Sequence, residues 1–416
     1  MTGPAARPPI EDRLAAAGLP PLPRTAWLEI DLDALTANLR LLGGLAGPGV
    51  PLRPVVKADA YGHGAIPVAR ALEAAGADGF CVAAIDEALD LRANGIQAPI
   101  LVLYPVPATW ATEAARQRIG VTAGDPFLLG ETLAATSTEG GSDRPLELEL
   151  EVETGLGRGG FSGPDAVEAA RRIAGAPGVR LAGLWTHLQA VEDPGQTAVQ
   201  IARFEAAVEA IGRTGIELPP RHVAASAALI VDGVAAYDGV RPGLALYGLP
   251  PDELDAGSIP SAVSEGLRPV MALLARPVRV ADLPAGWGIS YGPTFRTARP
   301  SRIATLPVGY GDGWSRRLSN RASAIVRGQR VPLVGNVAMD AVMADVTDVP
   351  GPAVTVDDEF TLLGGSGEVR ISAAELAQQR TTNSWEVVSS MARRVPRVYH
   401  AAAGPVDLRT LIERRD

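Results

Sequence analysis

Short apolar runs alternate with amphipathic stretches between residues 51 and 248, and this alternation restricts the fold more than any other feature. Helical patterns separate most of the runs, and several end in glycine, which commonly caps a helix C-terminus. Eight strand–helix units in about 200 residues predict a closed (β/α)8 barrel. An open doubly wound sheet is the alternative, but no G-x-G-x-x-G follows the first strand. The eight runs that read as strands are residues 51–59, 78–84, 99–104, 118–123, 146–153, 180–187, 221–226 and 240–248.

The character of the sequence changes after residue 264. β-branched runs separated by Gly, Pro and Asp now follow one another with little helix between them, which predicts a mostly antiparallel β domain. One helix is expected there, over residues 372–379. We therefore expect an α/β protein of three parts. These are an N-terminal extension (1–25, loosely ordered, with a short helix over residues 13–17), the (β/α)8 barrel (26–264) and the β domain (265–416).

Composition excludes several classes of protein. A chain of 416 residues is too long for one typical core, so two domains are expected. A net charge of -9 without a dense basic stretch argues against binding to nucleic acid. Cys81 is the only cysteine, which suits a reducing compartment, and no apolar run reaches the roughly 20 residues that span a bilayer. The N-terminal residues lack the pattern of a signal peptide. We expect a cytoplasmic protein without a membrane partner.

Polar side chains gather where the predicted barrel strands end. Active sites of (β/α)8 barrels lie at the C-terminal ends of the strands, so these residues should converge on one mouth. A single histidine or lysine at a strand end could be structural, but the whole set is typical of a site. The set comprises Lys57, Tyr61, His63, Glu151, Glu153, Arg158, His187, Ser226, Arg241 and Gly243.

Two features of this mouth predict a cofactor. The ends of strands seven and eight form the usual phosphate site of the fold, and here they carry Ser226 and Gly243. Lys57 follows an apolar strand, where desolvation disfavours the charged ammonium and leaves a nucleophilic amine. A lysine amine beside a phosphate site indicates pyridoxal 5'-phosphate (PLP). A sugar-phosphate aldolase would share both parts.

The motifs themselves resemble those of the alanine racemase family. They are VVKADAYGHG, TGLGRGGF, THL, HVAASAA, VRPGLALYG, ISYGPTF, LPVGYGDGW, VGNVAMD and RVPRVY, and they occur in the family's order. Together they cover the chain from about Trp27 to Tyr399. The resemblance implies a PLP-binding barrel joined to a C-terminal β domain.

The resemblance also implies roles for the matching residues. Lys57 would hold PLP and act as one catalytic base, and Tyr291 would be the second base on the opposite face of the substrate. Arg241, supported by His222, would face the pyridine nitrogen. Because a guanidinium stays charged, Arg241 would not protonate that nitrogen, which limits side reactions. The remaining cofactor residues would be Tyr61, Arg158, His187, Ser226, Gly243, Leu244 and Trp385; Arg158, Tyr310 and the backbone N–H of Met339 would contact the substrate; no metal is expected.

The activity implied is the interconversion of L- and D-alanine, which would supply D-alanine for biosynthesis. Proton removal on one face and delivery on the other needs two bases. In the family the second base comes from the other subunit, so we expect a homodimer in which Tyr291 acts in trans.

Four positions depart from the family pattern and leave the substrate open. Ala225 and Ala338 replace an asparagine and a cysteine, Trp385 replaces a phosphate-binding tyrosine, and Glu151 replaces a lysine that is often carbamylated. A racemase of another small neutral amino acid such as serine, or a non-catalytic PLP-binding homologue, are the alternatives. A PLP decarboxylase is less favoured because it would need a cysteine in the β domain. Known non-catalytic carriers lack the β domain and its tyrosine.

Overall fold

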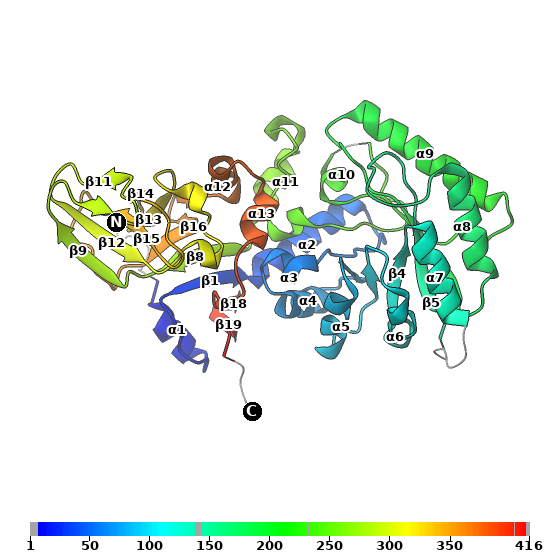
Figure 1. The fold of residues 1–416 in the computed structure, drawn as a ribbon, viewed down its shortest axis with the longest axis horizontal. Coiled ribbons are helices and arrows are strands. Elements are labelled where there is room, and N and C mark those ends of the chain that lie inside the picture. Colours follow the sequence, from blue (N-terminus) through cyan, green and yellow to red (C-terminus); the bar gives the residue numbers. More distant parts are fainter. Residues whose placement is uncertain (1–6, 138–143, 232, 403, 413–416) are drawn as a thin grey trace. The chain divides into compact units, whose positions relative to one another are not determined.

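The computed structural model of the chain describes residues 7–137, 144–231, 233–402 and 404–412 (Figure 1). Backbone contacts divide it into two units. The barrel unit comprises Leu35–Ala60 and Ala65–Arg268, and the sheet unit takes the chain up to Ala34, Tyr61–Gly64 and the chain from Pro269 onward. Within these described residues, no helix is long and apolar enough to cross a membrane.

Six parallel strands of the barrel unit pair in chain order. They are β2 (Phe80–Val82), β3 (Ile100–Val102), β4 (Ile119–Ala123), β5 (Leu146–Glu151), β6 (Val179–Trp185) and β7 (Arg221–His222). Isolated parallel bridges close the ring, because Val55 pairs with Cys81, Leu52 with Val240, and Ala225 with Arg241. The segments around residues 52–55 and 240–241 are therefore the first and eighth strands. The predicted (β/α)8 barrel is confirmed.

Helices of the barrel unit follow the strands and cover them. Helix α5 packs on β2 and β3, α6 on β4 and β5, and α8 on β5 and β6 (Figure 1). The apolar stripe of α8 is made of small residues and Ile173, which allows close approach to the strands. The helices are α2 (Leu32–Ala46), α4 (Ala65–Ala74), α5 (Ile85–Ala93), η1 (Ala108–Trp110), α6 (Ala111–Arg116), α7 (Pro126–Ser137), α8 (Gly163–Gly175), α9 (Pro194–Gly212), α10 (Ser226–Ile230), η2 (Leu244–Tyr247), η3 (Ala256–Ser258) and α11 (Ser261–Gly266).

The sheet unit is built on an eleven-stranded sheet whose pairs are antiparallel except for β1 with β18. Its strands are β1 (Ala26–Asp31), β8 (Met271–Ala275), β9 (Arg279–Leu283), β12 (Ser301–Leu306), β13 (Ser323–Val326), β14 (Gln329–Val334), β15 (Val342–Asp345), β16 (Phe360–Ser366), β17 (Val369–Ile371), β18 (Arg397–Ala401) and β19 (Gly404–Arg409). A separate hairpin joins β10 (Gly288–Ile289) to β11 (Phe295–Arg296). The mostly antiparallel β domain predicted from the sequence is thus confirmed. Four short helices lie between β12 and β18 in the chain, namely η4 (Tyr310–Asp312), η5 (Arg316–Leu318), α12 (Ala373–Arg380) and α13 (Ser384–Ser389).

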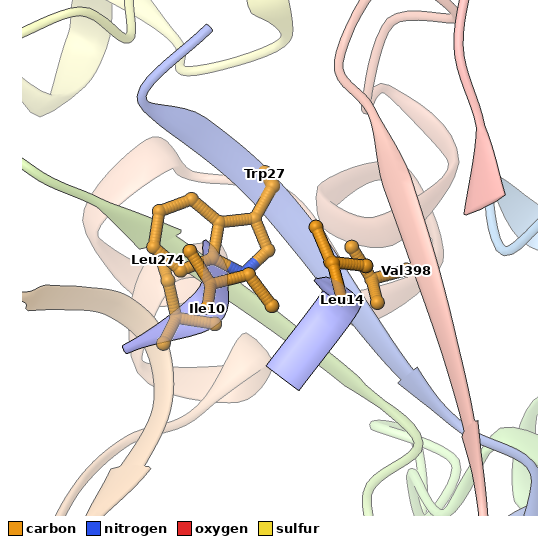
Figure 2. Close-up of a cluster of buried hydrophobic side chains, with 5 residues drawn as sticks. All are labelled: Ile10, Leu14, Trp27, Leu274 and Val398. Atoms are coloured by element: carbon orange, nitrogen blue, oxygen red, sulfur yellow. The ribbon is translucent and has the colours of Figure 1, made fainter. Parts of the chain in front are cut away.

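Two details of the N-terminal region differ from the sequence-based expectation. Strand β1, expected within the barrel, pairs instead with β8 and β18 of the sheet unit. Residues 10–16 form α1 (Ile10–Ala16) and are packed rather than loosely ordered. Figure 2 shows the reason: Ile10 and Leu14 of α1 lie against Trp27, Leu274 and Val398 in one buried cluster. Arg13 of the same helix also donates to Glu29 on β1 at 2.8 Å.

Candidate active site

Lys57 stands where the first barrel strand gives way to a left-handed turn, α3 (Lys57–Tyr61). The four residues after Lys57 all have φ between 51° and 56°, a conformation that costs a non-glycine residue about 1–2 kcal/mol. Several hydrogen bonds offset this cost. The N–H of Ala58 donates to Glu87 at 2.6 Å, and the N–H of Ala65 donates to Asp59 at 2.9 Å. Strain retained in this way is typical of functional sites.

The Lys57 amine lies in an environment that favours its neutral form. Burial lowers the pKa of Lys57, and the nearby charges of Arg158 and Arg241 lower it further. The sequence-based argument from desolvation predicted this direction. Lys57 is also the only lysine in the chain.

Arg241 is buried and held by four hydrogen bonds. Its Nη1 donates to the carbonyl oxygen of His222 at 3.0 Å and to the Nδ1 of the same residue. Its Nη2 donates to the carbonyl oxygens of Thr186 and Val223 at 2.9 and 3.3 Å, and the guanidinium lies 4.8 Å from the ring centroid of Trp185. Burial lowers the pKa of Arg241 to about 10, so the group stays charged near neutrality. The fifth donor, Nε–H, has no acceptor among the described residues and is available to a ligand.

Ser226 and the backbone of residues 243–245 form one hydrogen-bonded corner. The Ser226 hydroxyl accepts from the N–H of Gly243 at 2.8 Å and from the N–H of Ala245 at 3.2 Å. Leu244 lies between these two donors at the start of η2. The structure therefore brings together Ser226, Gly243 and Leu244, the three residues assigned to the cofactor here. The N–H of Gly243 donates to Ser226, and the hydroxyl proton of Ser226 is left to donate to a phosphate.

His187 and Arg158 are two further predicted site residues of the barrel unit. Burial lowers the pKa of His187 to about 3, and the charges of Arg241 and Arg158 add to the effect, so its ring is neutral. The Arg158 guanidinium lies 5.4 Å from the ring centroid of Tyr104 and 3.8 Å from the Oε1 of Glu151.

Glu151 is buried next to Arg158. A Cβ on Gly124 would lie 3.0 Å from its Oε2, so a larger residue there would press on the carboxyl. Burial raises the pKa of Glu151 to about 6, although Arg158 and Arg241 act in the opposite direction. The carboxyl is therefore ionised at neutral pH but at a cost in stability.

We predict that Glu151→Gln stabilises the cofactor-free protein above pH 6. Because the folded protein holds the Glu151 proton more tightly than the unfolded chain does, this group favours folding below about pH 4.5, and that contribution is lost as the pH rises through about 6. The shift corresponds to on the order of 2 kcal/mol. Melting temperatures between pH 4 and 8 check this, with Glu147→Gln, an exposed glutamate of the same strand, as the control. A Gln variant that is less stable at pH 7.5 would contradict the prediction.

Two residues of this region were missed by the sequence reasoning. Arg53, from the first strand, makes an ion pair with Glu149 of β5 at 2.7 Å, and Glu149 contacts the Nε2 of His222 at 2.6 Å. The alternation of leucine and glutamate over residues 146–151 was the available signal. It was interpreted only as a strand.

Tyr291, Met339 and Tyr310 lie in the sheet unit with exposed side chains, at 76%, 53% and 43% exposure. Asn336 ties two of these segments together, because its side-chain amide donates to the carbonyl oxygens of Tyr291 and Gly292 at 2.8 and 3.2 Å.

The Tyr310 segment is bound in turn to Met339. The N–H of Tyr310 donates to the carbonyl oxygen of Ala338 at 3.0 Å, and the N–H of Gly311 donates to that of Met339 at 2.9 Å. The proposed second base and substrate residues thus belong to one connected surface.

Tyr61 and Trp385, the other two assigned cofactor residues, also belong to the sheet unit. Tyr61 is buried, and Trp385 is half-buried in α13. Gly62 packs so closely on the carbonyl group of Val388 in α13 that a Cβ would collide with it, which explains the glycine after Tyr61. The predicted site residues thus form two groups, one in each unit.

Comparison with known proteins identifies the family. The models for the N-terminal and C-terminal domains of alanine racemase match residues 30–251 and 270–399. The chain is 42% identical over 380 residues to the alanine racemase of Symbiobacterium thermophilum, which covers 90% of this chain and 97% of that protein. It is 39% identical over 382 residues to the alanine racemase of Thermobifida fusca, with 91% and 98% coverage.

Solved structures of alanine racemases also match this chain. The alanine racemase from Bacillus anthracis, with bound L-Ala-P, matches with a TM-score of 0.86 at 32% identity, over 94% of this chain and 98% of that one. The alanine racemase from Streptomyces coelicolor matches with a TM-score of 0.80 at 36% identity, over 90% and 98%. The resemblance read from the sequence motifs is confirmed, and the chain belongs to the alanine racemase family of PLP-dependent isomerases.

Proposed function

We propose that this protein interconverts L- and D-alanine with PLP, using Lys57 and Tyr291 as the two bases. The observation that supports this most directly is the set of groups gathered in the barrel unit. The set comprises Lys57, whose pKa is lowered by burial, the buried Arg241 with an Nε–H that is unpaired within the described residues, and the Ser226 hydroxyl beside the backbone of Gly243.

The chemistry of these groups fits PLP. Lys57 offers an amine to an aldehyde, and the Ser226 hydroxyl, which accepts from the N–H groups of Gly243 and Ala245, offers its proton to a phosphate beside Gly243 and Leu244. The Nε–H of Arg241 suits the lone pair of a pyridine nitrogen, and the neutral His187 ring suits packing against an aromatic ring. In the sheet unit, Tyr61 and Trp385 would contribute further cofactor contacts.

The chemistry that PLP supplies when bound is the withdrawal of electrons from the substrate α-carbon. Lys57 Nζ would hold the cofactor and exchange a proton with that carbon on one face, and the hydroxyl of Tyr291 would do so on the other. Arg158 and the N–H of Met339 would orient the substrate. Arg241 remains charged near neutrality, so it would donate a hydrogen bond to the ring nitrogen without transferring a proton.

A homodimer with Tyr291 acting in trans is part of this proposal. The exposed side chains of Tyr291, Tyr310 and Met339 support it, as does Trp287 on the same hairpin segment with 52% exposure. Large apolar and aromatic groups exposed together are typical of surfaces that meet a partner. A second copy of the chain would cover them and complete each site.

We predict that alanine is the fastest substrate in a panel of L-amino acids. The relatives named alanine racemase that match over 90% and 91% of this chain support alanine. Ala225 and Ala338 are smaller than the residues of the family pattern, and burying one more substrate methylene in that space is worth about 0.8 kcal/mol, a several-fold gain for a larger substrate. Serine is therefore the main competitor. The purified protein with added PLP is incubated in D2O with each amino acid, and deuterium at the α-carbon is followed by NMR.

The outcomes of this panel separate the alternatives. Exchange with alanine far slower than with serine would overturn the alanine assignment and retain the racemase. Exchange with no amino acid, in a protein whose visible absorbance shows bound PLP, would indicate a non-catalytic binder and overturn the proposed activity.

A further inference from the structure

Three glutamates of β5 share one face of the strand because side chains alternate along it. Glu147 is exposed and pairs with Arg180, while Glu151 lies beside Arg158. Glu149, between them, is buried and has no part in the function proposed above. Its two partners come from the first and seventh strands, neither of which is adjacent to β5 in the barrel. The contacts therefore cross the barrel interior.

Glu149 is clamped by a two-point ion pair. Arg53 Nη2 donates to Oε1 at 2.7 Å, and Nη1 donates to Oε2 at 3.2 Å. Burial alone would raise the pKa of Glu149, but the charge of Arg53 and the hydrogen bonds from Arg53 and His222 outweigh it and hold that pKa below its usual range. The carboxylate is thus ionised near neutral pH.

Glu149 and Arg241, on opposite sides of the ring, together favour one tautomer of His222, whose Nε2 also lies 3.3 Å from Nη1 of Arg53. A guanidinium has donors and no acceptor, so the Nδ1 that faces Arg241 must carry a lone pair. The ring proton of a neutral histidine then lies on Nε2, which donates to Glu149 at 2.6 Å. Burial and Arg241 lower the pKa of His222 to about 3, so the ring is neutral. The ring is also stacked on Trp185 at 6.1 Å, with 8° between the planes.

We propose that Glu149, held by Arg53, is a positioning residue that fixes the Nε2–H tautomer of His222 and through it the guanidinium of Arg241. Without the carboxylate, the proton of His222 could move to Nδ1. An N–H would then face the N–H groups of Arg241 and displace them. The tautomer of His222 follows from the geometry of its contacts, whereas the effect of that tautomer on the reaction rests on the proposed function.

NMR of the cofactor-free protein tests the tautomer directly. The chain has four histidines, so protein labelled with 15N-histidine gives few signals, and His222→Gln identifies those of residue 222. We expect a protonated Nε2 and a bare Nδ1 that do not change between pH 6 and 9. In Glu149→Gln, which has one acceptor oxygen for two donors, we expect a mixture of tautomers. Glu147→Gln is the matched control on the same strand and should leave the spectrum unchanged.

A double variant guards against misfolding caused by an unpaired Arg53. Arg53→Met/Glu149→Leu removes both charges at once, which is often neutral for stability, and leaves Nε2 of His222 without its acceptor. The same mixture of tautomers is expected. An unchanged Nε2–H tautomer in both variants would overturn the inference, whether or not the protein racemises alanine.

Kinetics of the PLP-loaded protein test the consequence. We expect kcat to fall at least about tenfold in both variants, by analogy with the loss of a partner that orients a metal-binding histidine, while KM and the melting temperature of the double variant change little. Altered tautomers with an unchanged kcat would overturn the positioning role. A wild type without racemase activity would count against the proposed function and leave the NMR test of the tautomer decisive.

Discussion

Lys57→Ala is expected to lose both the covalent attachment of PLP and the racemase activity. Because Lys57 is the only lysine in the chain, no other side-chain amine can replace it. The variant also loses one of the two bases. A single general acid or base typically contributes about 10²- to 10⁴-fold to the catalysed rate. Borohydride reduction in the presence of PLP, followed by mass spectrometry, should find one cofactor per wild-type chain, on the peptide that contains Lys57. The variant should carry none.

Lys57→Arg is the matched control for this prediction. It keeps a positive charge at the end of the first strand and removes only the primary amine. If both variants lose the reduced adduct while the arginine form keeps its folded stability, the amine is the anchor. An adduct retained in Lys57→Ala at any site other than the N-terminal amine would contradict the assignment.

The barrel could be predicted from the sequence because the pattern that indicates each strand and helix lies within a short segment of the chain. Each strand–helix unit carries its own apolar periodicity, and eight units leave few alternatives to a closed ring. The place of β1 was not predictable in this way. Its partners, such as Leu274 and Arg397, lie more than 240 residues away in the chain, and its apolar pattern suits a strand in either unit.

The conformation of the turn after Lys57 also escaped prediction. Alanine, aspartate and tyrosine have no intrinsic preference for positive φ that would mark a left-handed turn. The turn is fixed by groups outside it, such as the carboxylate of Glu87. Lys57 could be recognised as a site residue, but its backbone geometry could not.

The polar interior of the barrel shows the same limit. Alternating leucine and glutamate over β5 is typical of a strand with one face in water. Closure of the barrel turns the glutamate side inward, where Glu149 meets Arg53 and His222. Site residues at strand ends could be predicted from the sequence because the active sites of this fold lie at those ends. Contacts across the barrel interior could not, because they depend on which strands face one another.

Tyr291→Phe is expected to slow racemisation by orders of magnitude while leaving Lys57 able to exchange a proton on its own face. The side chain is 76% exposed, so loss of the hydroxyl should not disturb the fold. Exchange of the α-hydrogen for deuterium should then be better retained from one enantiomer of alanine than from the other. Tyr237→Phe, a tyrosine of the barrel unit that is outside the predicted site and donates to Glu205, is the control for the loss of a phenol hydroxyl. Equal loss for both enantiomers would count against two bases.

Mixing the two inactive variants tests whether Tyr291 acts in trans. A dimer of one Lys57→Ala chain and one Tyr291→Phe chain would hold one site with both intact bases and one site with neither. With equal amounts and free exchange of subunits, half of the dimers are mixed, so activity should recover to about a quarter of the wild-type value. Subunit exchange is measured separately with differently tagged chains. If the tagged chains exchange and activity does not return, each site draws both bases from a single chain.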